Sequence, residues 1–257
     1  MNASLAQSFA NRAMELLAPV GSFEALKAAV VCGADAVYLG MERYGARADA
    51  GNFNNENLTR ALEFAHLRGV KVYVTVNTLI KDSELSDAVR AIKYALQAGA
   101  DAFIIQDLGL IAELNKSVPE AVLHASTQAG ICNAHGAAFV KRLGLSRIVA
   151  ARESIAEDIA AIKRNTGLEI EFFCQGALCV AYSGNCYYSS LVSGCSGNRG
   201  KCLQLCRKKY SFSKESGYFL SAKDICLLDK IEKLKSLGVD SLKIEGRLRT
   251  PEYVAET

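Results

Sequence analysis

Five of the nine cysteines lie in one polar, glycine-rich stretch, GALCVAYSGNCYYSSLVSGCSGNRGKCLQLC, at residues 176–206. The start of the sequence lacks the basic head and long apolar run of a secretory signal, so we expect a cytoplasmic protein without a membrane segment. Structural disulfides are rare in that reducing compartment, where clustered cysteines more often bind a metal or perform redox chemistry. The odd number of cysteines also argues against a fully paired disulfide framework.

The spacing of these thiols leaves three kinds of site open. Cys179, Cys186, Cys202 and Cys206 are separated by six, fifteen and three residues, and Cys226 follows further on. A structural zinc ion favours two tight C-x-x-C pairs, whereas only Cys202 and Cys206 are close. A redox disulfide needs only two of the thiols. An iron-sulfur cluster tolerates uneven spacing, and a loop rich in Gly and Ser lets backbone amides turn toward the sulfurs, so we favour this interpretation.

A repeated pattern of a helix end, a glycine and a short apolar run organises the chain. It occurs in CGADAVYLG, RGVKVYVTVN, AGADAFIIQD, LGLSRIVAAR and LGVDSLKIEGR. Glycine suits the left-handed end of a helix, and a run rich in Val, Ile, Phe and Tyr suits a strand buried on both faces. Three further runs, MELLAP, AVLHAST and LEIEFFCQG, complete a set of eight predicted strands.

Helical patterns lie between most of these strands, at residues 22–31, 55–67, 83–97, 133–143, 155–165 and 227–237. We expect Ser22, Ser83 and Ser154 to cap three of the helices. The alternation favours an α/β fold, a (β/α)8 TIM-type barrel, with a doubly wound open sheet as the alternative.

The predicted organisation has three parts. They are an N-terminal extension over residues 1–13, a barrel over residues 14–257, and a cysteine-rich insertion over residues 174–226 that follows the seventh strand. Pro251 begins a last helix that we expect to be incomplete.

The active site of such a barrel lies at the C-terminal ends of its strands. The residues that end the predicted strands are Pro19, Gly21, Gly40, Asn77, Asp107, Ser126, Thr127, Gln128, Arg152, Glu153, Gln175, Gly176, Glu245, Gly246 and Arg247. We interpret this polar set as a pocket for a carboxylated or phosphorylated ligand, with Arg152 and Arg247 as anion clamps. The alternative is structural, with Asp107 and Ser126 as helix caps and Arg152 and Glu153 as a solvated ion pair.

Two further groups of side chains are open to a functional or a structural interpretation. His124 lies within a predicted strand, where it either faces the barrel mouth or belongs to the core. Basic and aromatic residues surround the cysteines, which suits either the docking of a single-stranded RNA loop or a solvated rim. They are Arg199, Lys201, Arg207, Lys208 and Lys209 with Tyr187, Tyr188 and Tyr210. The net charge of +3 is too small to decide between these, and no H-E-x-x-H motif or nucleophile elbow favours a protease.

Longer motifs give the sequence a resemblance to a known family. ELLAPVGSFEALKAAVVCGADAVYLG, GVKVYVTVNTLIKDSEL, HASTQ, ARESI, QGALCVAYSGNCYYSSLVSGCSGNRGKCLQLCR and SLKIEGRLRTPEYVAE occur in this order from Met14 onward. They resemble the collagenase-like peptidase family of unassigned catalytic type. This chain departs from the common family pattern at Gln175, Cys195 and Leu205. Members usually continue into a further C-terminal region, which we expect to be absent here.

The resemblance implies two activities. Some members are described as collagenases, and others are implicated in the oxygen-independent hydroxylation of a tRNA uridine, an rRNA cytidine or ubiquinone precursors. The latter members carry a 4Fe-4S cluster on four cysteines, and those that act on RNA depend on prephenate. By motif, the resemblance implies Cys179, Cys186, Cys202 and Cys226 as ligands, with Cys206 as the alternative for the fourth position.

We therefore predict an iron-sulfur enzyme that hydroxylates a base of tRNA or rRNA with prephenate as co-substrate. Prephenate would bind at Arg152, Arg247, Asn77 and Gln128, and the candidate catalytic residues are Arg152, Glu153, Arg247 and His124. The alternative is a collagenase-like peptidase that acts on a protein substrate. A further alternative is a binding or assembly subunit whose barrel is completed by a partner chain.

Overall fold

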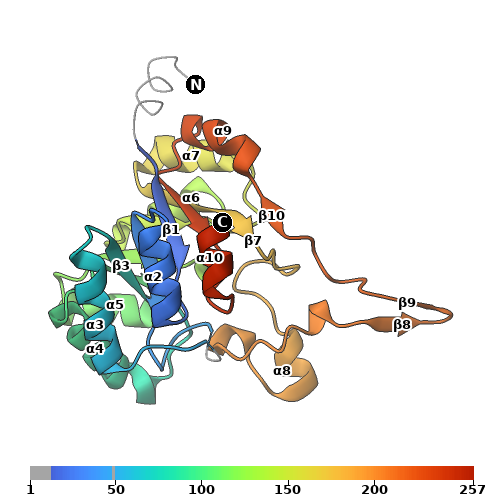
Figure 1. The fold of residues 1–257 in the computed structure, drawn as a ribbon, viewed down its shortest axis with the longest axis horizontal. Helices are drawn as coiled ribbons and strands as arrows, with labels where there is room; N and C mark the ends of the chain where they lie inside the picture. The colour runs from blue at the N-terminus through green and yellow to red at the C-terminus, as the bar shows by residue number, and fades with distance from the viewer. Residues whose placement is uncertain (1–12, 48–49) are drawn as a thin grey trace.

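The eight predicted strands form one closed parallel sheet in the computed structural model, which describes residues 13–47 and 50–257 (Figure 1). The strands are β1 (Glu15–Pro19), β2 (Ala36–Gly40), β3 (Lys71–Val76), β4 (Ala102–Ile105), β5 (Leu123–Ala125), β6 (Arg147–Val149), β7 (Glu169–Gly176) and β11 (Ser241–Ile244). Strand β7 pairs with both β6 and β11, and β11 pairs with β1, so the sheet closes on itself. This confirms the TIM-type barrel and excludes the open sheet. The predicted extension over residues 1–13 lies outside the described residues except for its last position.

Alternate residues of each strand face opposite sides of the barrel wall. Leu17, Tyr38, Tyr73, Ile104 and Phe173 belong to a cluster in the barrel interior. Their strand neighbours pack outward against the helices in a second, larger cluster. Because both faces of the wall are covered, the strands are nearly continuous apolar runs, which is the pattern that the sequence shows.

Helices cover the outside of the barrel (Figure 1). They are α2 (Phe23–Val31), α3 (Asn55–His66), α4 (Asp82–Gln97), α5 (Leu108–Ser117), α6 (Ala134–Arg142), α7 (Ala156–Thr166), α9 (Ile231–Ser236) and α10 (Pro251–Glu256). The helical patterns predicted from the sequence did not include α5. In the described part of the chain, no helix is long and apolar enough to cross a membrane.

The predicted helix caps are only partly correct. Ser22 accepts a hydrogen bond from the Ala25 amide at 3.1 Å and caps α2 as expected. The predictions for Ser83 and Ser154 are wrong, because α4 begins after Lys81 and α7 begins after Ile155. At α4 the Glu84 carboxylate reaches back to the Lys81 amide at 2.9 Å, and this bond replaces a serine cap. Asp107 accepts from the Leu110 amide at 2.8 Å and caps α5.

The cysteine-rich insertion runs between β7 and β11 and extends away from the barrel (Figure 1). It contains α8 (Tyr188–Ser193), the antiparallel strands β8 (Tyr210–Phe212) and β9 (Glu215–Gly217), and the short strand β10 (Ile225–Cys226), which pairs with the end of β7. The chain leaves the barrel at Gly176, whose φ is +111°. A Cβ there would lie 2.6 Å from the Glu245 carbonyl oxygen, so only glycine fits this close approach.

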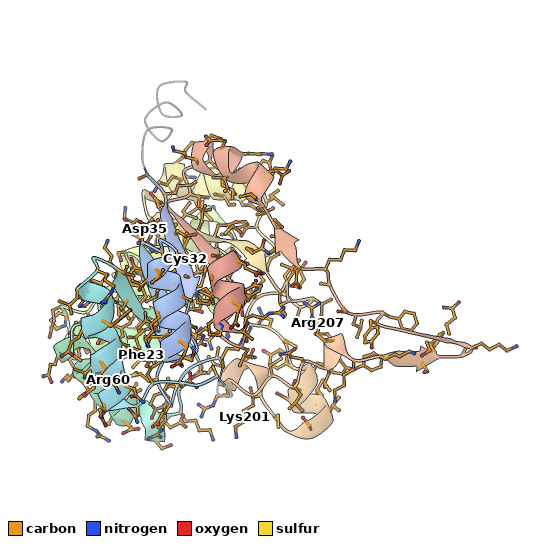
Figure 2. The ribbon with its side chains drawn as sticks, viewed as in Figure 1. Phe23, Cys32, Asp35, Arg60, Lys201 and Arg207 are labelled. Atoms are coloured by element: carbon orange, nitrogen blue, oxygen red, sulfur yellow. The ribbon has the colours of Figure 1, made fainter. Side chains whose placement is uncertain are left out.

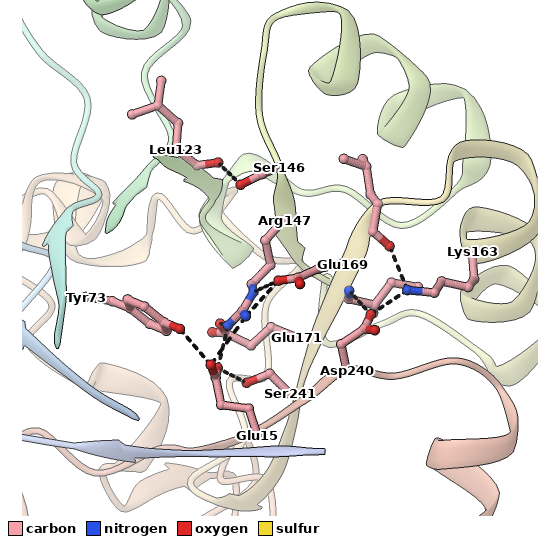
Figure 3. A network of polar contacts seen from close by, with 12 residues as sticks. Glu15, Tyr73, Leu123, Ser146, Arg147, Lys163, Glu169, Glu171, Asp240 and Ser241 are labelled. Atoms are coloured by element: carbon pink, nitrogen blue, oxygen red, sulfur yellow. Dashed lines mark hydrogen bonds and ion pairs between the residues drawn. The ribbon is translucent and has the colours of Figure 1, made fainter. Parts of the chain in front are cut away.

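A buried network of charges occupies the N-terminal end of the barrel (Figure 3). The Arg147 guanidinium binds the carboxylates of Glu169 at 2.8 Å and of Glu171 at 3.4 Å, and it also pairs with Glu15 at 2.5 Å. The Lys243 ammonium binds the other oxygen of Glu171 at 2.6 Å. Burial alone would raise the pKa of Glu15, but its hydrogen bonds and charge contact with Arg147 outweigh this and bring the pKa below its ordinary value.

Replacement of Arg147 by alanine should destabilise the protein strongly. Arg147→Ala leaves the fully buried Glu171 carboxylate with one cation and removes the cation that holds Glu15 and Glu169. We expect a loss of about 3–5 kcal/mol in the free energy of unfolding, measured by urea denaturation. The matched control is Arg90→Ala. The Arg90 side chain is 70% exposed, so this substitution should lower the free energy of unfolding by less than about 1 kcal/mol. Similar losses for both variants would contradict a structural role for the buried network.

Candidate functional site at the thiol-lined mouth of the barrel

A cavity of about 380 Å³ lies between the C-terminal ends of the strands and the insertion. Arg47, Gln128, Arg152 and Glu245 line it from the barrel, and a smaller cavity of about 40 Å³, deeper in the barrel, shares the same four residues. The insertion supplies most of the remaining wall of the larger cavity, including Cys179, Cys186, Cys202 and Cys206. The site is therefore a joint product of the barrel and the insertion.

The four thiols that line the cavity are free and close enough to influence one another. Burial raises the pKa of the Cys206 thiol, and the neighbouring Cys179, Cys202 and Cys186 raise it further. Within residues 13–47 and 50–257, no three His, Cys, Asp or Glu side chains are arranged to hold one metal ion. What these four thiols share is the wall of one cavity.

The fifth cysteine named by the motif, Cys226, is not among the residues that line this cavity. It is exposed on β10, opposite Gln175, and contributes to raising the pKa of Cys174. Burial is the main cause of the raised Cys174 pKa, which is about 11. The cavity wall contains Cys206 but not Cys226. The geometry therefore favours Cys206 as the fourth thiol of the set, whereas the family motif favours Cys226.

Arg47 and Glu245 form an ion pair at the mouth of the barrel, with Nη2 and Oε1 separated by 2.9 Å. Burial alone would raise the pKa of Glu245, but Arg47 and Arg152 lower it below its ordinary value. Sequence reasoning missed Arg47 because it lies in the loop after β2, seven residues beyond the strand end. The sequence did contain a signal for a site residue in this loop. The polar, Arg-containing segment MERYGARADAGN directly follows the end of a barrel strand, where site residues are expected.

Arg247 points into the deeper cavity and is almost completely buried. Its Nη1 donates to Thr75 Oγ1 at 3.0 Å, and burial lowers the pKa of the guanidinium to about 10. Gly40 makes room for it, since a Cβ at that position would lie 2.3 Å from Nη1. Arg247 lines only the deeper cavity, whereas Arg152 lines both.

Arg152 and Gln128 present unused hydrogen-bonding groups to both cavities. The Arg152 guanidinium lies 5.0 Å from the centre of the Phe173 ring, and among the described contacts it makes no hydrogen bond or ion pair of its own. Gln128 Oε1 is buried without a partner in the described structure. A cationic donor and a neutral acceptor therefore face the same space, which suits a ligand that carries both a carboxylate and a hydroxyl group.

The remaining predicted residues have different environments. Glu153 accepts hydrogen bonds from the Ser183 amide at 3.2 Å and hydroxyl at 3.0 Å, and so ties the insertion to the end of β6. Asn77 Oδ1 accepts from the Ala46 amide at 2.9 Å and holds the loop that carries Arg47. His124 lines neither cavity.

His124 lies deeper in the barrel, 4% exposed, with its ring edge against Tyr73. Burial lowers its pKa well below the ordinary value, so the ring stays neutral. The residue opposite His124 on β6 is Arg147, which lies at the N-terminal end of the barrel. His124 therefore lies away from the mouth, which the strand pattern alone does not reveal.

Two arginines of the predicted basic rim serve the structure of the insertion. The Arg199 guanidinium binds both carboxylate oxygens of Glu84 at 2.7 Å and the Leu79 carbonyl at 2.6 Å. The Arg207 guanidinium donates to the carbonyls of Leu178 and Ala222 and lies between the barrel and the projecting hairpin (Figure 2). Lys201, Lys208 and Lys209 remain exposed.

The fold and the site place this chain among (β/α)8 barrel proteins. Its distinguishing feature is a thiol-rich insertion over the barrel mouth, which makes a site lined by cations and cysteines. The model of peptidase family U32 matches residues 21–257, and the chain belongs to this family. The solved structure of the U32 peptidase Mk0906 shares the fold, with a TM-score of 0.62 and 15% identity over 92% of this chain and 94% of that chain.

Some curated relatives are named for RNA hydroxylation, and one is named a collagenase. The chain is 42% identical to the 23S rRNA 5-hydroxycytidine C2501 synthase of Escherichia coli (94% of this chain, 37% of the relative). It is 38% identical to tRNA hydroxylation protein P1 of Bacillus subtilis (94% and 60%) and 38% identical to a collagenase of Porphyromonas gingivalis (93% and 62%). The chain thus spans less than two thirds of the length of these relatives.

The Arg199–Glu84 pair should stabilise the docked insertion in a pH-dependent way. Hydrogen bonds from Arg199 lower the pKa of Glu84 to about 2. Because the pKa of Glu84 is lowered in the folded protein, the pair adds stability when the pH is above the ordinary carboxyl pKa of 4.5. This contribution disappears as the pH falls toward about 2. Glu84→Gln should therefore lower the melting temperature at about pH 6, and the difference from wild type should shrink at lower pH.

Hydrogen exchange provides a second readout of this contact. Arg199→Ala should speed amide exchange around Asn198, whose carbonyl accepts from the Leu79 amide and from Gln106. The control is Lys201→Ala, an exposed cation two residues away, which should leave exchange unchanged. Equal exchange in both variants would contradict the docking role of Arg199.

Proposed function

We propose that the protein is an enzyme that hydroxylates a base in tRNA or rRNA, using a 4Fe-4S cluster in the thiol-lined cavity. The observation that carries the proposal is the shared wall, in which four free cysteines face the unpaired Arg152 guanidinium and Gln128 Oε1. Two relatives are named for the hydroxylation of rRNA or tRNA, which supports RNA as the substrate class. An RNA substrate also agrees with a cytoplasmic location.

The donor set fits a cluster better than a single zinc ion. In a 4Fe-4S cluster each iron takes its own thiolate, so the ligands surround a volume, whereas four zinc ligands converge on one atom. Cys179, Cys186 and Cys202 would hold three irons, and either Cys206 in the wall or Cys226 on β10 would hold the fourth. When bound, the cluster would supply electron transfer or an iron that binds an oxygen donor.

The barrel mouth would bind the small co-substrate. A carboxylate such as that of prephenate would pair with the Arg152 guanidinium, which makes no ion pair among the described contacts, and a hydroxyl group would donate to Gln128 Oε1. Asn77 and Arg247 would line the deeper end. Glu245 stays ionised because Arg47 and Arg152 lower its pKa, so it would orient the two guanidiniums without moving a proton.

A peptidase is the second candidate, because the family is named for it and one relative is named a collagenase. A cysteine peptidase needs a thiol of lowered pKa beside a histidine. In the described cavity wall, burial raises the pKa of Cys206 and no histidine is present. The described wall therefore does not support a cysteine peptidase.

Cysteine substitutions test the cluster directly. In protein purified without oxygen, Cys179→Ser, Cys186→Ser and Cys202→Ser should each lose iron, acid-labile sulfide and the brown chromophore. Cys195→Ser, which changes a thiol outside the cavity wall, should keep all three. Of Cys206→Ser and Cys226→Ser, one should lose the cluster and thereby identify the fourth ligand. Zinc without sulfide in the wild-type protein would refute the cluster.

Substitution of Arg152 tests the co-substrate site. In a strain that lacks the gene, Arg152→Ala should restore RNA hydroxylation about tenfold to a hundredfold less well than wild type, because a charge-assisted hydrogen bond is lost. Iron content should be unchanged, and Arg164→Ala on the exposed face of α7 is the control. The measurement is mass spectrometry of nucleosides from total RNA.

Two results would contradict the proposed activity. One is an unchanged set of hydroxylated nucleosides in the deletion strain. The other is gelatin cleavage by the purified protein that Cys206→Ala abolishes, which would support the peptidase instead.

A further inference from the structure

Residues 208–223, which we call the basic hairpin, form a separate projection from the insertion (Figure 1). Strands β8 and β9 pair only with each other, with Tyr210 opposite Gly217 and Phe212 opposite Glu215. A two-stranded hairpin has little stability alone, so its position depends on contacts at its root, the end that joins the rest of the insertion. The Tyr210 hydroxyl donates to the Leu205 carbonyl at 2.8 Å and accepts from the Tyr188 hydroxyl at 2.8 Å.

The charge of the basic hairpin is strongly positive for its length. It contains Lys208, Lys209, Lys214 and Lys223 against a single acid, Glu215, so its net charge of +3 equals that of the whole chain. All four lysines are exposed, and none makes an ion pair among the described contacts. The lysines are therefore available to an anionic partner.

Exposed aromatic rings alternate with these lysines. Phe212, Tyr218 and Phe219 are 80%, 63% and 56% exposed, although burial of such rings would stabilise the protein. Phe219 is held beside Gly217, where an added Cβ would lie 3.3 Å from the ring. Rings presented between cations suit unpaired bases, which stack on aromatic side chains while their phosphates pair with lysine.

The root of the basic hairpin is also a wall of the thiol-lined cavity. Tyr188, Leu205 and Arg207 line the cavity, and the first two hold Tyr210. Arg207 donates to Leu178 near the start of the insertion and to Ser221 and Ala222 in the returning leg of the hairpin. A strand bound along the hairpin would thus lead to the cavity, where one base must leave the stack to react.

We propose that the basic hairpin docks a single-stranded segment of RNA and directs it to the cavity; this inference rests on the proposed RNA-modifying function. The charge argues against a second copy of the chain as the occupant, because two hairpins of +3 repel each other. It favours a polyanion with exposed bases.

Binding of a fluorescent single-stranded oligouridylate of about 12 nucleotides, followed by anisotropy, tests the proposal. The triple variant Lys208→Ala, Lys209→Ala, Lys214→Ala should bind at least about tenfold more weakly, and the slope of log affinity against log salt should fall by about 2. The double variant Phe212→Ala, Tyr218→Ala should also bind about tenfold or more weakly, but with an unchanged slope, because stacking releases no counterions.

The matched control is the triple variant Lys93→Ala, Lys116→Ala, Lys233→Ala, which removes the same charge from exposed positions on α4, α5 and α9. Its affinity should equal that of wild type. Wild-type affinity of the hairpin variants, no RNA binding by the wild-type protein, or a dimer that the hairpin variants abolish in sedimentation would each overturn the docking proposal.

Nucleoside analysis of cells that express the same variants separates this proposal from the proposed function. If hydroxylation persists while the hairpin variants bind RNA normally, the docking proposal fails and the function stands. If RNA binding requires the hairpin but no hydroxylated nucleoside depends on the gene, the function fails and the docking proposal stands.

Discussion

One fully buried carboxylate, that of Glu171, joins the N-terminal end of the barrel interior to its centre. Arg147 binds it from the N-terminal end and Lys243 from the centre, at 3.4 and 2.6 Å. The Lys243 ammonium lies 4.0 Å from the centre of the Tyr38 ring, whose hydroxyl donates to the Ile244 carbonyl at 2.8 Å. Because a buried charge is tolerated only when it is paired, these contacts fix β11 against its neighbours. Glu245 and Arg247 follow directly on β11, so the same contacts determine where the charged residues of the mouth lie.

Close backbone contacts then determine how the insertion sits on that frame. Gly184 has a φ of +75°, and a Cβ there would lie 1.9 Å from the Gln128 carbonyl oxygen. The turn that follows Ser183 therefore packs directly on the short 3-10 turn after β5 (Thr127–Ala129), which carries Gln128. Glu153 holds Ser183 from the barrel side, and Arg199 joins the far part of the insertion to α4. The barrel contributes the charged groups of the cavity and the insertion contributes the thiols, so neither part forms the site alone.

The sequence predicted the barrel because each strand is a local pattern, an apolar run after a glycine that ends a helix. The cysteines were equally visible, because thiol clustering is a feature of the linear sequence. Arg47 and Lys243 were missed for opposite reasons: Arg47 lies in a loop whose path depends on tertiary contacts, and Lys243 lies inside a strand that otherwise reads as apolar. The basic rim was visible, but the sequence does not reveal that Arg199 and Arg207 are used by internal partners. Such assignments depend on which groups meet across long sequence separations.

The charge balance of the cavity gives a physical reason for the pairing of thiols with arginines. Arg47, Arg152, Arg207 and Arg249 line the larger cavity, with Glu245 as the acidic residue of the same wall. An excess of cations in a partly enclosed space favours anionic occupants, whether thiolates or a carboxylated ligand. Burial nevertheless raises the pKa of Cys206 more than Arg207 lowers it, so the arginines alone do not produce a thiolate there. A coordinated metal does so, since a ligating thiol is deprotonated outright. The wall therefore combines a field that favours anions with thiols that would become anions on binding the proposed cluster.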